Sequence, residues 1–320
     1  MERRGIYGLH EGEGYHMMAA CPGWQVELYG LGHDPRHVPV ANLDRLVRAG
    51  IEPIGRLVHG YDGAGTLPLP ADLSGFVECV VKFVTAAPLL HHIIIGNEPN
   101  HILERPGNVP ITAWYCAQCF NKCAEAIRAI PGHRDDVIMI PPVAPWNDQT
   151  GDWLEYFDNL LRLCVGFTGI ALHTYTHGHE PALITSGAVM DPPYHDRYYN
   201  FWAYKDFLER VPDEHKGLPV FITETDQDSP WLDVNSGWVK NAYYDINHWN
   251  SVPGNQQIRA LVLYRYPRID KWYIEGLRGV EQDFREAVAL GYTTGSGNDE
   301  VARLRVAIGA MIAIGQAALG

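Results

Sequence analysis

Basic residues are scarce in this 320-residue sequence, which has 25 Lys and Arg against 38 Asp and Glu and a formal net charge of -13. A nucleic-acid-binding surface needs clustered Lys and Arg to meet the phosphates, and the sequence shows no such cluster. We therefore expect no nucleic-acid partner. A neutral or cationic partner fits this charge better.

Long apolar runs are also missing. The start, MERRGIYGLH, lacks the apolar core of a secretory signal, so we expect either a cytoplasmic protein or the mature form of a secreted one. Residues 291–300 read as a flexible connector and 301–320 as an apolar helix, but this helix contains Gln316 and its uncharged part falls short of the ~20 residues that span a membrane. We expect no membrane span. The oligomeric state stays open.

Cysteine is too sparse for a disulfide-stapled scaffold, with six residues scattered along the chain. Cys116, Cys119 and Cys123 fall on one face of a predicted helix, where free cysteine behaves as a small buried apolar residue. We expect this trio to be structural, with metal binding as the alternative.

Short apolar runs alternate with longer amphipathic segments up to residue 290, a pattern typical of βα units around a parallel sheet. The amphipathic segments carry apolar residues at helical spacing. The predicted strands are 5–11, 24–31, 52–59, 92–98, 136–143, 169–175, 219–225 and 260–266.

Eight such units close most naturally into a (β/α)8 TIM barrel of the α/β class, in which the C-terminal ends of the strands carry the active site. An open doubly wound sheet is the competing topology, but the first predicted strand has no Gly-rich phosphate-binding turn after it. The sequence therefore predicts one catalytic barrel over 1–290 and a short C-terminal extension over 291–320.

Two glutamates stand at the ends of apolar strands. In IIIGNEPNH the strand stops at Asn97-Glu98-Pro99, where the proline removes a donor and restricts the backbone of Glu98. In LPVFITETD, three units later, Glu224 reaches the same rim. Carboxyl groups on the fourth and seventh strands of a closed barrel face each other, as glycosidic cleavage requires of its acid and its nucleophile.

This pattern resembles clan A of the glycoside hydrolases, whose members have the sequence Asn-Glu-Pro at the end of strand four and a glutamate at the end of strand seven. The resemblance implies a retaining glycosidase without a cofactor or metal, acting on an oligosaccharide or polysaccharide. It implies Glu98 as acid/base, Glu224 as nucleophile and Asn97 as a ligand of the sugar 2-hydroxyl.

Other strand ends supply further substrate-binding candidates. His173 and Tyr175 share one face of the sixth strand; by the resemblance Tyr175 bonds Glu224, and His173 contacts the acid/base region or the sugar. Arg56 on the third strand can lower the pKa of the nucleophile, although the clan's arginine is expected one strand earlier. His10 and His59 are weaker candidates for contacts with sugar hydroxyls, because each is as easily a structural histidine.

The eighth strand departs from the clan, which has a tryptophan there as the floor of the cleavage subsite. This chain has LVLYRYPRIDKW, so Tyr264, Tyr266 or Trp272 would have to replace it, and Trp146 after the fifth strand is a further stacking candidate. Substrate identity is therefore less determined than reaction type.

Two other classes of function compete with this hypothesis. A metal-dependent barrel hydrolase would use His173, His177, His179 and Asp226 as ligands. A carbohydrate-binding barrel without catalysis would retain the fold, but binding alone requires no opposed pair of carboxyl groups.

Overall fold

The computed structural model describes residues 4–294 and contains a closed barrel of eight parallel strands in the order β1-β2-β3-β4-β5-β6-β7-β8. The (β/α)8 fold class is confirmed. The strands are β1 Tyr7–His10, β2 Trp24–Gly30, β3 Glu52–Val58, β4 His92–Ile95, β5 Val137–Ile140, β6 Gly169–His173, β7 Val220–Thr225 and β8 Ile258–Leu263.

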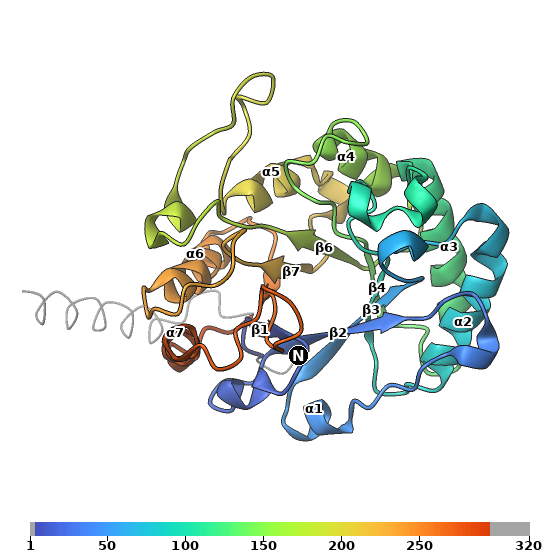
Figure 1. The fold of residues 1–320 in the computed structure, drawn as a ribbon, viewed down its shortest axis with the longest axis horizontal. Helices are drawn as coiled ribbons and strands as arrows, with labels where there is room; N and C mark the ends of the chain where they lie inside the picture. Colours follow the sequence, from blue (N-terminus) through green and yellow to red (C-terminus); the bar gives the residue numbers. More distant parts are fainter. Residues whose placement is uncertain (1–3, 295–320) are drawn as a thin grey trace, which may run out of the picture.

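Seven α-helices in this part of the chain surround the barrel (Figure 1). They are α1 Asp44–Arg48, α2 Leu73–Thr85, α3 Ala113–Arg128, α4 Trp153–Leu163, α5 Ala203–Arg210, α6 Trp238–Ser251 and α7 Arg278–Ala289. The β1–β2 connection holds the 3₁₀ helix Gly14–Met18 in place of an α-helix. The long yellow-green connection between β6 and α5 projects away from the ring (Figure 1).

The apolar core has two layers, because side chains on a barrel strand alternate between the interior and the helix-facing side. Nine buried residues, including Val26, Ile54, Met139 and Phe221, fill the interior. A larger layer lies between strands and helices and takes in the whole cysteine trio of α3. All six cysteines are free and buried, which supports a structural role for the trio.

The predicted strands agree with the observed ones in number and order, but β4 and β5 end three residues earlier than expected, and β8 starts two and ends three residues earlier. Beyond α7 the backbone pairs with the start of the chain, since Ile6 donates to the Tyr292 carbonyl and Thr294 to the Arg4 carbonyl. The predicted C-terminal helix lies outside the described residues. Within residues 4–294, no helix is long and apolar enough to cross a membrane.

Candidate active site

A cavity of about 620 Å³ opens at the C-terminal ends of the strands. Its lining includes Glu98 and Glu224 together with six other predicted site residues, namely Asn97, Tyr175, Arg56, Trp146, Tyr264 and Trp272. Side chains from β3 and β7, and from the loops that follow β4, β5, β6 and β8, therefore meet in one place. This is the end of the barrel where the sequence predicts the site.

Glu98 follows β4 by three residues and has a positive φ of 34°. Residues other than glycine rarely adopt a positive φ, because their Cβ makes this backbone conformation unfavourable. Such strain is concentrated at functional sites. The side chain points toward β6, where its Oε1 lies 2.7 Å from Nδ1 of His173. The backbone thus accepts an unfavourable conformation that aims this carboxyl group into the cavity.

Glu224 lies opposite, and one of its carboxyl oxygens is within 4.8 Å of one of Glu98. The Tyr175 hydroxyl lies between the two groups, 3.2 Å from Oε1 of Glu98 and 3.1 Å from Oε2 of Glu224. Retaining glycosidases hold their two carboxyl groups about 5–5.5 Å apart, and inverting ones about 6.5–9.5 Å. This separation of less than 4.8 Å between two of their oxygens is nearer to the retaining value than to the inverting one.

The charge of Glu224 is stabilised by positive groups beneath it. Arg56, 1% exposed, donates to its Oε1, and Nε2 of His10 lies 3.8 Å from the same oxygen. Burial by itself would raise the pKa of this carboxyl group, but the charges of His173, when protonated, and of Arg56 outweigh burial and lower the pKa. Arg56 is the cation that remains when His173 is neutral. Glu224 is therefore ionised at neutral pH.

An irregular register in β7 explains how Glu224 faces inward. Phe221 belongs to the barrel interior and Ile222 to the helix-facing layer, so strict alternation would turn Glu224 outward with Ile222. The pairing with β8 shifts between Ile222 and Thr225, and the pairing with β6 shifts at His173. Such irregularities re-aim side chains, and here they bring Glu224 to Arg56.

His173 links the two halves of the site. Arg56 has donors only, so its Nη2 donates to Nε2 of a neutral His173 at 3.2 Å. The imidazole proton then lies on Nδ1 and is directed to Glu98. The single Tyr175 proton remains for Glu224, and burial, followed by the charges of Glu224 and Glu98, raises the pKa of Tyr175 well above its usual value.

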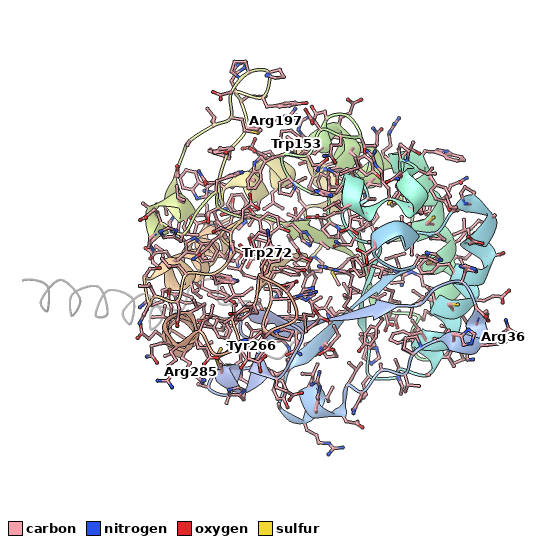
Figure 2. The ribbon with its side chains drawn as sticks, in the orientation of Figure 1. Arg36, Trp153, Arg197, Tyr266, Trp272 and Arg285 are labelled. Atoms are coloured by element: carbon pink, nitrogen blue, oxygen red, sulfur yellow. The ribbon has the colours of Figure 1, made fainter. Side chains whose placement is uncertain are left out.

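Aromatic side chains border the cavity. Trp146 is fixed by its Nε1, which donates to the Tyr198 carbonyl at 2.8 Å, and its ring lies 4.3 Å from that of His177. Tyr264 and Trp272 also line the cavity and come from the segment after β8, where the sequence lacks the clan's tryptophan. Trp272 is labelled in Figure 2. Tyr266 is 7% exposed and outside the lining, so it does not serve as the replacement.

Two predicted substrate contacts, those of His59 and His10, need correction, while His173 contacts the acid/base region, which is one of the two alternatives expected for it. His59 does not line the cavity; it stacks on His33 and its Nδ1 bonds the Ala64 carbonyl at 3.0 Å. His10 and His173 are completely buried and lie behind the carboxyl groups, so they contact Glu224 and Glu98 and not the open cavity. Strand position alone does not separate a residue on the cavity wall from one behind it.

Sequence reasoning missed several polar lining residues, among them Tyr61, Glu104, Asp228 and Arg265. Tyr61, Glu104 and Asp228 lie in loops whose course a strand pattern does not define. Asp226, two residues after Glu224 in TETD, was considered only as a metal ligand. The sequence did contain a signal for Asp226, because it directly follows the strand that carries the site residue Glu224.

The ligands of the metal-dependent alternative are not brought together. His177 stacks on Tyr199 with ring centroids 3.8 Å apart, and His179 lies 3.3 Å from Glu180. Within the described residues, the groups with metal-ligand geometry are Glu98, His173 and Glu224, and His91, His133 and Asp136 at the other end of the barrel. The first group is occupied by its own hydrogen bonds, as described above.

Fold and cavity together define a (β/α)8 barrel with a pair of carboxyl groups at the catalytic end. No protein-family model matches the sequence, and no curated protein sequence is significantly similar to it. The solved structures similar to this chain include glycoside hydrolases of the clan A type.

Three of them illustrate the likeness. A glucosidase from Croceicoccus marinus has a TM-score of 0.61 at 11% identity, over 91% of this chain and 68% of its own. A xyloglucanase of Glycoside Hydrolase Family 44 from Paenibacillus polymyxa has a TM-score of 0.56 at 13% identity, over 90% of this chain and 76% of its own. A fungal beta-1,4-galactanase has a TM-score of 0.52 at 13% identity, over 89% of this chain and 94% of its own. At these identities the likeness shows the shared fold.

Proposed function

We propose that this protein is a retaining glycoside hydrolase that cleaves β-linked glycosides or polysaccharides by double displacement. The observation that carries the proposal is the pair of carboxyl groups within 4.8 Å of each other at the catalytic end of the barrel. Glu224 is the nucleophile and Glu98 the general acid/base. The barrel neighbours named above, a glucosidase, a xyloglucanase and a galactanase, support the same reaction class.

The two environments suit two different roles. In the first step the ionised Glu224 attacks the anomeric carbon, while protonated Glu98 gives its proton to the departing glycosidic oxygen. In the second step Glu98 accepts a proton from water, whose oxygen attacks the same carbon and releases Glu224. Arg56 and Tyr175 hold Glu224 charged and aimed, and His173 holds Glu98.

The rest of the cavity accommodates the sugar. Asn97 is 5% exposed and lies next to Glu98 in the lining, where its amide can meet a sugar hydroxyl. Trp146, Tyr264 and Trp272 offer flat faces to the apolar sides of pyranose rings. The volume of about 620 Å³ accommodates a short stretch of an oligosaccharide.

The test is product stereochemistry followed by active-site variants. We expect proton NMR of a β-aryl glycoside or β-glucan digest to show the β-anomer first. Glu224→Ala is expected to lower kcat by several orders of magnitude, and Glu98→Ala to spare substrates with activated leaving groups. Azide is expected to give a β-azide from the Glu98 variant and an inverted azide from the Glu224 variant.

Each competing function predicts a different result. An α-anomer formed first by the wild type would contradict retention. Binding of glycans without cleavage, equal in wild type and Glu224→Gln, would favour the carbohydrate-binding barrel. Loss of activity with a chelator would favour the metal-dependent hydrolase. Glu78→Ala, an exposed change on α2, is the matched control and leaves activity intact.

A further inference from the structure

The cavity holds more carboxyl groups than the proposed reaction needs. Glu104, Asp226 and Asp228 line it together with Glu98 and Glu224. The two arginines of the lining are already paired, Arg56 with Glu224, and Arg265 with Glu11 at 2.8 Å and with Asp270 at 3.0 Å. The additional carboxyl groups therefore leave a surplus of negative charge.

Ion pairs within residues 4–294 do not neutralise this surplus, although Arg56 acts on Glu104 and Lys271 on Asp228 from a greater distance. Neither Glu104 nor Asp226 forms an ion pair with any residue in that range, and Asp228 has only His177, at 3.9 Å. Burial raises the pKa of Asp226 well above its usual value, and burial together with the charges of Glu98 and Glu224 raises that of Glu104 to about 8. Repulsion among the carboxyl groups contributes to the raised pKa of Glu104, and a bound cation would offset it.

Two acceptor oxygens near the proposed acid/base are without partners. Nδ2 of Asn97 lies 3.4 Å from Oε1 of Glu104, so the two side chains are adjacent. Oδ1 of the almost fully buried Asn97 and Oε2 of Glu104 accept no hydrogen bond. Buried acceptors without donors are costly, so both oxygens suit a donor supplied by a ligand.

From this geometry we propose that the substrate is a glycoside of an amino sugar, whose free ammonium group binds between Asn97 and Glu104. This inference rests on the proposed glycosidase function and specifies its substrate class. An ammonium group has three donors and no acceptor, which matches the two free oxygens, and its charge matches the acidic lining. An N-acetyl group would bring an acceptor without charge, and a uronate would be repelled.

The test compares substrates that differ only in this substituent. Tetramers and 4-nitrophenyl β-glycosides of glucosamine and galactosamine are assayed against their N-acetyl and neutral hexose counterparts. We expect kcat/KM for the free amino sugars to be at least about tenfold higher than for their counterparts. This preference is expected to shrink in about 0.5 M NaCl, because salt screens the attraction between charges. Glu104→Gln is expected to remove most of the preference, and Glu78→Gln on α2 none of it.

The outcomes separate the two proposals. Cleavage of neutral substrates with equal or greater efficiency, and an equal effect of Glu104→Gln on both sets, would refute the ammonium site while leaving the glycosidase intact. Cleavage of no β-glycoside at all, by a protein with a native melting transition, would refute the proposed function and the inference with it. A preference for amino sugars that survives Glu104→Gln would overturn the assignment to Glu104.

Discussion

At the scale of single residues, Tyr175 is the contact that joins the two proposed catalytic groups. Its hydroxyl lies 3.1 Å from Glu224 and 3.2 Å from Glu98, yet it has only one proton to donate. The neutral tautomer of His173 supplies Glu98, so the Tyr175 proton serves Glu224. In the proposed reaction, the Tyr175 hydroxyl loses its charged acceptor when Glu224 forms a bond to the sugar.

Tyr175→Phe removes this donor and little volume. A hydrogen bond to a charged group contributes about 1.5–3 kcal/mol, so we expect kcat/KM to fall about 10- to 150-fold. Kinetics on an activated aryl glycoside, with the melting temperature as a check on folding, measure the effect. Tyr244→Phe, a change on the exposed side of α6, is the control. Full activity in Tyr175→Phe would show that the bridge is dispensable.

At the scale of elements, the connection between β6 and α5 is anchored by Arg197. Its guanidinium lies over the ring of Trp153, 4.5 Å from the centroid, and donates to Oδ1 of Asp152 at 2.6 Å (Figure 2). Asp152 also caps α4 by accepting from Leu154 and Glu155. The same connection carries His177 and Tyr199, which pack against Trp146 at the cavity.

Arg197→Ala is expected to loosen this connection and with it one wall of the cavity. Loss of a nearly buried charged contact and its stacking is expected to lower the free energy of unfolding by about 1–3 kcal/mol and to raise KM about 3- to 10-fold with a smaller change in kcat. Urea unfolding and steady-state kinetics test both effects.

Arg210→Ala is the matched control, because Arg210 pairs with Asp158 at the surface, where such pairs contribute little. Equal effects of the two substitutions would mean that Arg197 acts as an ordinary surface charge.

At the scale of the whole molecule, buried acids with raised pKa values couple stability to pH. Burial and neighbouring charges raise the pKa of Glu104 to about 8, and burial raises that of Asp206 to about 7. In the unfolded chain these groups titrate at about 4.3 and 3.9. Between those values the folded protein holds protons that the unfolded chain has lost, so stability decreases as pH rises.

We therefore expect the melting temperature to fall between about pH 5 and pH 8. Glu104→Gln combined with Asp206→Asn is expected to flatten this slope, because neither replacement titrates. Carboxyl groups with lowered pKa values, such as Glu224 and Asp152, act in the opposite direction, but only at more acidic pH. A wild-type melting temperature that rises across this range would contradict the prediction.

The sequence by itself determined the barrel and the positions of its two glutamates. Buried parallel strands are nearly continuous in apolar residues, so eight of them could be counted, and a closed barrel places the ends of β4 and β7 on one rim. The pairings of Tyr175 with Glu224 and of His173 with Glu98 followed from the resemblance and from the two-residue period of β6.

Only the tertiary structure decided which side chains reach the cavity. The register shifts that turn Glu224 inward depend on pairing with β6 and β8, and a regular alternation would have turned it outward. His59 was predicted in the site but contacts His33 instead, whereas Glu104 and Asp228, from the connections between elements, were not predicted and line the cavity. Local patterning sets which segments become strands, whereas side-chain direction at strand ends and in loops depends on contacts between residues distant in the chain.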